Sequence, residues 1–180
     1  MPTIITHPAV PLALALGLGP RAVPTRLLLA GVMASIVPDL DVVGFRLGIS
    51  YGHPLGHRGF SHSLVFAVLL ALAAGLGSRR LDTSFRRAFW FIFVSTASHG
   101  ILDSFTNGGR GVAFLSPWSN ARYFAPVQPI EVSPLSILRF FAEGGADVIL
   151  TEIIWVWTPC AALAGLLFAV RKKFAPINGL

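Results

Sequence analysis

Two stretches of the chain carry side chains that can bind a metal ion. Residues 53–63 read HPLGHRGFSHS and contain three of the five histidines, and they follow an acidic turn, PDLD, at residues 38–41. Further on, His99 and Asp103 stand four residues apart in an apolar segment. On a helix this spacing places both side chains on one face, one turn apart, as in helical zinc sites. The two stretches together predict a metal site.

The candidate ligands outnumber the needs of a single ion. Zinc binds histidine nitrogen and carboxylate oxygen, and a catalytic zinc keeps one position for water. Two ions about 3.5–4 Å apart that share a carboxylate would use the surplus, and such pairs suit phosphoester hydrolysis. The expected cofactor is therefore one or two divalent metal ions, zinc first among them. The candidate ligands are His7, Asp39, Asp41, His57, His62, His99 and Asp103.

The composition is typical of an integral membrane protein. Among the 180 residues, 54% are apolar and 12% are charged, whereas about a quarter of a soluble protein is charged. The mean hydropathy is +0.71. The net charge of +6 comes from few, dispersed residues, so nucleic acid is not an expected partner. We expect one membrane-embedded domain over residues 1–180, with the lipid bilayer as its partner and a metal-site core at residues 7–131.

Five apolar segments must position the candidate ligands, which predicts an all-α, multi-pass helical bundle. They cover residues 9–18, 27–37, 64–77, 88–102 and 148–170. The last segment is long enough to cross the bilayer and is the predicted C-terminal anchor, while the others are shorter than the ~20 residues that a span needs. The second is expected to stop at Pro38. Residues 104–139, rich in Gly and Pro, predict a long external loop.

The distribution of basic residues indicates an orientation. If the five segments alternate in direction, nine Arg and Lys residues in the connections 21–26, 78–87 and 171–173 share one face. The positive-inside rule makes this face cytoplasmic. The same alternation places the candidate ligands, which come from four separate stretches, at the opposite face. We therefore expect a site on the extracytoplasmic side of the cell (inner) membrane.

The order H…PDLD…HRGFSHS…HGILD resembles the YdjM-like family of small bacterial membrane-bound proteins, from residue 7 to about residue 131. Members are described as metal-dependent hydrolases, and the family is remotely similar to zinc-dependent phospholipases C and single-strand zinc nucleases. The resemblance implies that Asp41 or Asp39, together with His62, His99 and Asp103, holds one metal. It also implies that His7 joins a second metal beside Asp103. No histidine follows His99, so a third metal is not expected.

The expected activity is hydrolysis of a phosphoester by metal-activated water, and the membrane setting extends the candidate substrates to lipids. Arg58 is a candidate for binding a phosphate oxygen, but it can equally pair with Asp39 or Asp41. Glu131 is a candidate base. His57 is either a ligand or a group that orients a carboxylate.

Two other classes of protein remain open at this point. A non-catalytic metal-binding membrane protein, such as a carrier or a sensor, would place its ligands at the middle of the membrane. A structural module would use these polar residues only as helix caps, and exchange of His62 for Gln would then leave metal content unchanged. The candidates lie at segment ends, which favours an enzyme. The sequence indicates no particular oligomeric state.

Overall fold

The computed structural model describes residues 1–134, 136–142 and 144–174, and within these ranges the secondary structure is helical, with two isolated β-bridges and no strand. The predicted all-α class is confirmed. The elements are α1 (Ala9–Leu18), α2 (Thr25–Ile36), η1 (Val37–Val42), α3 (Val43–Arg46), η2 (Phe60–His62), α4 (Leu64–Leu76), η3 (Ser78–Leu81), α5 (Phe85–Ser104), α6 (Ile137–Ala142), α7 (Gly145–Glu152), η4 (Ile153–Trp157) and α8 (Thr158–Lys173).

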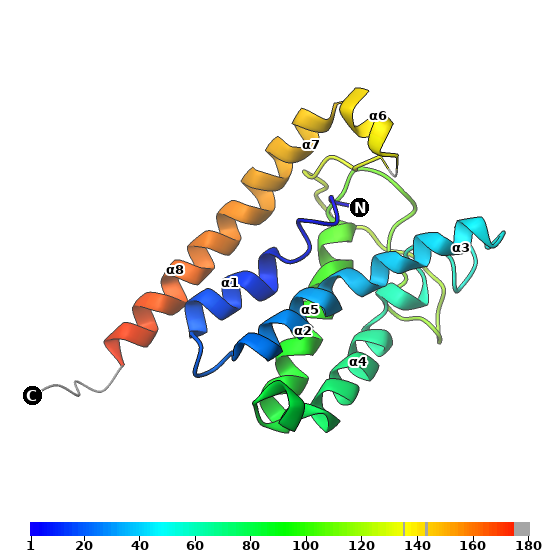
Figure 1. Cartoon of the computed structure of the whole chain (residues 1–180). Coiled ribbons are helices and arrows are strands. Elements are labelled where there is room, and N and C mark those ends of the chain that lie inside the picture. The colour runs from blue at the N-terminus through cyan, green and yellow to red at the C-terminus, as the bar shows by residue number, and fades with distance from the viewer. Residues whose placement is uncertain (135, 143, 175–180) are drawn as a thin grey trace, which may run out of the picture.

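Helix α5 packs against both α2 and α4 (Figure 1). Their shared core includes Leu27 from α2, Ala71 from α4, and Phe91 and Ile92 from α5. A Cβ at Gly31 would lie 2.3 Å from the Phe91 ring, so glycine is what lets α2 approach α5 so closely. This three-helix core holds the first half of α5, and the same helix carries His99 and Asp103 near its other end.

Helices α7, η4 and α8 run on as one helix, Gly145–Lys173, of 29 residues, or about 44 Å at 1.5 Å per residue. Helix α1 packs along it, and both stand out to one side of the core in Figure 1. Ala9 and Val156 form a second small core with Ile130 from the long loop. The predicted anchor helix is therefore also a packing partner for the N-terminal segment.

Two helices in the described part of the chain are long and apolar enough to cross a membrane, Thr25–Arg46 and Gly145–Lys173, whereas the sequence predicted five apolar segments. The α-helix α2 ends at Ile36, in agreement with the predicted stop at Pro38, but the helical segment does not end there and continues as η1 and α3. Proline lacks an N–H, but it lies in the first turn of η1, where that donor is not needed. The chain therefore continues helically to Arg46, with 22 residues in all.

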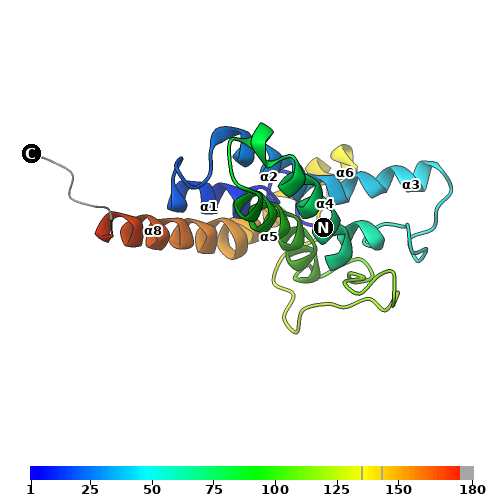
Figure 2. The same ribbon diagram turned by 90° about the horizontal axis from the view of Figure 1, so that it is seen from below.

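Different elements lie at the two ends of the bundle. The α1–α2 turn, η3 and the end of α8 lie on the lower side of Figure 1, while α3 and the long loop lie at the opposite, upper right. Figure 2 shows that the long loop between α5 and α6 lies below the layer of helices. Along α4 and α8 large apolar side chains such as Leu69, Leu166 and Phe168 are exposed, as expected for helices that face lipid.

Candidate metal centre

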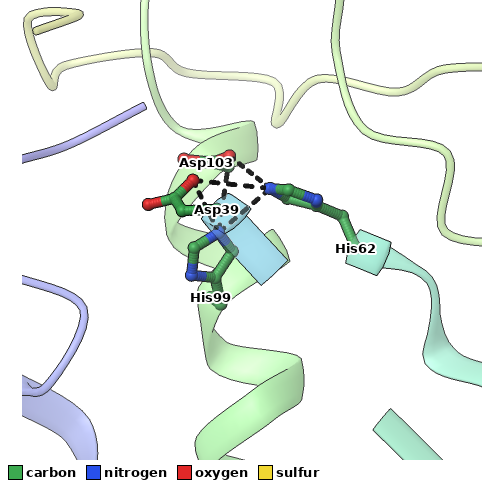
Figure 3. A group of neighbouring side chains, drawn as sticks. All are labelled: Asp39, His62, His99 and Asp103. Atoms are coloured by element: carbon green, nitrogen blue, oxygen red, sulfur yellow. Dashed lines mark hydrogen bonds and ion pairs between the residues drawn. The ribbon is translucent and has the colours of Figure 1, made fainter. Parts of the chain in front are cut away.

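Four buried side chains from three elements converge where the end of α5 meets η1 and η2. Asp39 comes from η1, His62 from η2, and His99 and Asp103 from α5. Each offers one ligand atom, and these atoms all lie within 4.8 Å of one another. Figure 3 shows the four side chains pointing toward a common centre. We call this group the Asp39 cluster.

The distances within the Asp39 cluster match the spacing of ligands around one cation. His62 Nε2 lies 3.0 Å from His99 Nε2 and 3.2 Å from Asp103 Oδ2. Asp39 Oδ1 lies 3.3 Å from His99 Nε2 and 3.9 Å from His62 Nε2. Ligand atoms of a tetrahedral zinc with bonds of 2.0–2.1 Å are about 3.3 Å apart. His99 Nε2 lies 3.9 Å from Asp103 Oδ2, so two of these separations are longer than the ideal spacing and the four atoms approximate a tetrahedral ligand set.

Several buried polar atoms here have no hydrogen-bond partner among the described residues. They include both carboxylate oxygens of Asp39, Asp103 Oδ1 and both ring nitrogens of His7, whereas Asp103 Oδ2 lies in an ion pair with Arg58 Nε. Buried polar atoms are nearly always satisfied, because leaving them unpaired costs free energy. A divalent cation would satisfy several at once, so the donor set fits a metal.

Neighbouring groups orient both cluster imidazoles. His99 Nδ1 lies 2.7 Å from the backbone oxygen of Ser35, which can only accept, so Nδ1 carries the proton and the Nε2 lone pair faces the cluster. His62 Nδ1 lies 3.2 Å from Asp41 Oδ2, which favours the same tautomer. Such outer hydrogen bonds are typical of metal-binding histidines.

His7 lies against the outer side of the cluster. Its ring stacks on His99 with 3.7 Å between centroids. Its Nε2 lies 3.6 Å from Asp39 Oδ2 and 3.8 Å from Asp103 Oδ1, the second oxygen of each carboxylate. Burial lowers the pKa of His7 to about 3, so the ring is neutral and able to bind a cation.

Asp41 and His57 form a neighbouring group with His62. Asp41 Oδ1 lies 2.6 Å from His57 Nδ1. Asp41 Oδ2 accepts hydrogen bonds from Ser61 Oγ and from the backbone N–H of Arg58. Both oxygens of Asp41 are thus occupied, whereas those of Asp39 are unpaired. Of the two carboxylates that the resemblance left open, the geometry favours Asp39 as the ligand and Asp41 as the group that orients His62.

Arg58 is fully buried, and its partner differs from both expected carboxylates. Its Nε lies 3.0 Å from Asp103 Oδ2. Its Nη1 donates to the backbone oxygen of Gly108 and its Nη2 to Thr106 Oγ1. The guanidinium is therefore committed within the protein, not presented to a substrate phosphate. Arg58 also has φ of 60°, a left-handed conformation that non-glycine residues adopt rarely and often at functional sites.

Glu131, the candidate base, is exposed and accepts a hydrogen bond of 2.7 Å from Asn107 Nδ2. Among the described contacts none joins it to the cluster, so the geometry gives no support to a role as base. Glu152 is different. This carboxylate of α7 is buried and accepts hydrogen bonds from the hydroxyls of Thr3 and Thr6, at 2.6 Å each. Glu152 therefore holds the N-terminal segment that leads to His7. The sequence does not indicate this role, because Glu152 stands alone in an apolar run.

A cavity of about 440 Å³ opens beside the cluster, and Asp39 forms part of its wall. The other walls are mostly apolar and come from residues 1–5, Val42, Phe140 and Phe141. Sites for small molecules are commonly apolar clefts with a few polar groups at one point. Here Asp39 is the point of contact between the cavity and the buried ligands.

The fold and the cluster together define an all-helical membrane protein with a buried group of metal-competent side chains. The chain belongs to the YdjM inner membrane protein family, which it matches over residues 1–175. It is 47% identical over 173 residues to inner membrane protein YbcI of Escherichia coli (strain K12), covering 96% of this chain and 100% of that protein. No solved structure matches the chain. The predicted family is thereby confirmed.

Proposed function

We propose that this inner membrane protein is a metal-dependent hydrolase that acts on a phosphoester. The observation that carries the proposal is the Asp39 cluster, where two imidazoles and two carboxylates meet at ligand spacing with buried carboxylate oxygens unpaired. Arg58 compensates Asp103, but the buried carboxylate of Asp39 accepts no hydrogen bond from the described residues, and leaving this charge without a bound cation would be costly. The ligand set of nitrogen and oxygen, without sulfur, suits zinc and similar divalent ions.

A cation bound here would supply Lewis acidity, which activates water and neutralises charge on a phosphoryl group. Asp39 and Asp103 would hold it through one carboxylate oxygen each, together with Nε2 of His62 and Nε2 of His99. The other oxygen of each carboxylate, Asp39 Oδ2 and Asp103 Oδ1, faces His7 Nε2. This arrangement supports a second ion beside His7. Arg58 keeps Asp103 ionised and oriented, so its role is positioning.

The substrate reaches the cluster through the cavity at Asp39. Because the cavity walls are largely apolar, a substrate with an apolar group beside its phosphoester fits better than a fully hydrophilic one. The long loop and α3, near the cluster, lie at the end opposite the basic connections 21–26, 78–87 and 171–173. The positive-inside rule therefore supports a site on the extracytoplasmic side.

A metal-binding protein without catalysis is the second candidate, and the complete burial of the four ligand residues favours it. Catalysis needs a ligand position open to water, and Asp39 is the residue of the cluster that lines a cavity. The two candidates differ in one outcome, since both predict bound metal but the hydrolase alone predicts turnover.

The test combines metal content with turnover. Wild-type protein, His99→Gln, Asp103→Asn and the exposed loop variant His53→Gln are purified in detergent and analysed by elemental mass spectrometry. Hydrolysis of a chromogenic phosphodiester is then measured with added zinc or manganese. We expect at least one metal per chain and turnover in wild type and His53→Gln, and loss of both in the cluster variants. Equal, negligible metal in all four proteins would refute the proposal, and bound metal without turnover would favour the second candidate.

A further inference from the structure

A second cavity, of about 570 Å³, lies at the opposite end of the molecule. It is enclosed by the end of α1, the α1–α2 turn, the start of α5 and the end of α8. In Figure 1 the end of α8 and the α1–α2 turn lie at the lower left, and α5 begins at the bottom of the view. The cavity is remote from the Asp39 cluster, and nothing in the proposed function uses it.

Four cations line this cavity: Arg21, Arg87, Arg171 and Lys172. No carboxylate lines it in the part of the chain that the structure describes. The one ion pair of a nearby turn joins Arg26 to Asp82 at 3.2 Å, outside the cavity. Four positive charges without a carboxylate repel one another and attract an anion.

Arg171 is built into this cavity. Its Nη1 is buried and has no hydrogen-bond partner among the described residues. A Cβ at Gly19, where φ is +81°, would lie 1.7 Å from that nitrogen, so the guanidinium occupies space that glycine leaves free. A buried N–H donor without an acceptor costs free energy. The arrangement therefore lacks an acceptor, which an anionic ligand would supply.

The remaining walls identify the kind of anion. Leu18, Pro20, Ala22 and Phe174 are apolar, and a small inorganic anion would leave them without a partner. The cavity also borders the end of the longest apolar helix, Gly145–Lys173, where lipid headgroups meet the protein. A phospholipid has a phosphate for the arginines and a glycerol–acyl region for the apolar walls, and basic pockets between helices at the cytoplasmic side are suited to acidic headgroups.

We propose that this basic cavity binds the headgroup of an anionic phospholipid from the cytoplasmic leaflet. Arg87 and Arg171 donate to the phosphate, Lys172 adds charge, and Leu18 and Phe174 contact the start of the acyl chains. The site is independent of the metal centre and joins α1, α5 and α8 at their basic ends. Bound lipid would therefore hold α8 to the rest of the bundle.

The test measures lipid retention by native mass spectrometry of the full chain in an uncharged detergent. Phosphatidylglycerol, phosphatidylcholine and inorganic phosphate are added separately. We expect phosphatidylglycerol to bind at least about tenfold tighter than phosphatidylcholine, and phosphate to bind no more than weakly. Equal retention of the two lipids would overturn the proposal. Phosphate binding as tight as that of phosphatidylglycerol would assign the cavity to a free anion instead.

Matched variants separate this cavity from general surface charge. Arg87→Gln with Lys172→Gln removes two exposed cavity cations, and Arg79→Gln with Arg80→Gln removes two exposed cations of η3 that do not line it. Both pairs lower the net charge equally and spare buried groups. We expect about tenfold weaker phosphatidylglycerol binding in the first pair and little change in the second. Equal weakening in both pairs would contradict a specific site.

Discussion

Two imidazole nitrogens, His62 Nε2 and His99 Nε2, face each other across 3.0 Å at the centre of the cluster. Two lone pairs at this distance repel, so a proton or a metal ion must lie with them. In the metal-free protein the proton belongs to His62. Burial alone would lower the pKa of His62, but hydrogen bonds to Asp103 and Asp41 outweigh it and raise the pKa to about 9. Metal binding must displace this proton.

We therefore predict that zinc binding releases about one proton at pH 7 and that affinity rises about tenfold per pH unit between pH 6 and 8. The pKa of His62 is raised above its ordinary 6.5. Its charged form therefore stabilises the metal-free fold fully below about pH 6.5, and this contribution disappears as the pH rises through about 9. Calorimetric titration in two buffers of different ionisation enthalpy counts the protons. A pH-independent affinity with no proton release would contradict the assignment.

Arg58 gives a prediction about stability. Arg58→Gln removes the buried partner of Asp103, and an uncompensated buried charge costs about 3 to 5 kcal/mol. Thermal unfolding of the metal-free protein should show a large loss for Arg58→Gln and little change for the exposed Arg110→Gln. Bound metal should restore part of the loss, because it supplies the positive charge. Similar melting temperatures for the two variants would mean that the ion pair with Asp103 contributes little.

Residue types and spacing were enough to select the side chains that meet in the cluster. The separation of His99 and Asp103 by four residues predicts a shared helix face, and all four residues of the Asp39 cluster were among the candidates. The different surroundings of Asp39 and Asp41 were not predictable, because they depend on the turn of η1 and on where Ser61 and Arg58 donate. The contact between Arg58 and Asp103 joins a loop to helix α5, which is distant in the sequence, and it has no local signal.

At the level of elements, α5 supplies two cluster residues and brings η2 within reach. A Cβ at Gly100 would lie 2.9 Å from the backbone oxygen of His62. Glycine next to His99 thus lets the two histidines approach. Substitution of Gly100 by a larger residue would separate α5 from η2 and open the cluster.

The long C-terminal helix contributes through Glu152. Glu152→Gln weakens the hydrogen bonds that hold Thr3 and Thr6, so His7 should lose its fixed position. We predict reduced occupancy of a second metal while the first ion is retained, measured as metals per chain. The exposed Glu131→Gln is the control and should match wild type. A fall in the first ion for Glu152→Gln, or no change at all, would show that Glu152 does not act through His7.

The elements themselves were predicted unevenly. Apolar runs located α1, α4 and the long C-terminal helix within a few residues, because burial and lipid exposure both favour continuous apolar sequence. The helical continuation through Pro38 to Arg46 was missed, since proline ends most helices but here stands in the first turn of a new 3-10 helix, η1. The short helix α6, which overlaps the end of the predicted loop, was missed as well, because six residues carry little periodic signal.

Over the whole molecule, the α1–α2 turn, η3 and the end of α8 lie at one end, and α3 and the long loop lie at the other (Figure 1). The positive-inside rule then predicts a cytoplasmic η3 and an extracytoplasmic loop. In a Cys160→Ser background, a membrane-impermeant thiol reagent should label Asn120→Cys in intact cells but should label Arg80→Cys only after lysis. The opposite pattern would place the metal centre in the cytoplasm, and labelling of both positions in intact cells would argue against this topology.

The ligand environment of the metal that the purified protein retains tests the central claim most directly. X-ray absorption at the edge of that metal reports the ligand atoms and their distances. The Asp39 cluster predicts nitrogen and oxygen ligands alone, with imidazole scattering from two histidines, and for zinc, distances of about 2.0–2.1 Å. His62→Gln and His99→Gln should each remove imidazole scattering or the metal itself. A spectrum with sulfur ligands, or one unchanged by both variants, would contradict a metal held between η1, η2 and α5.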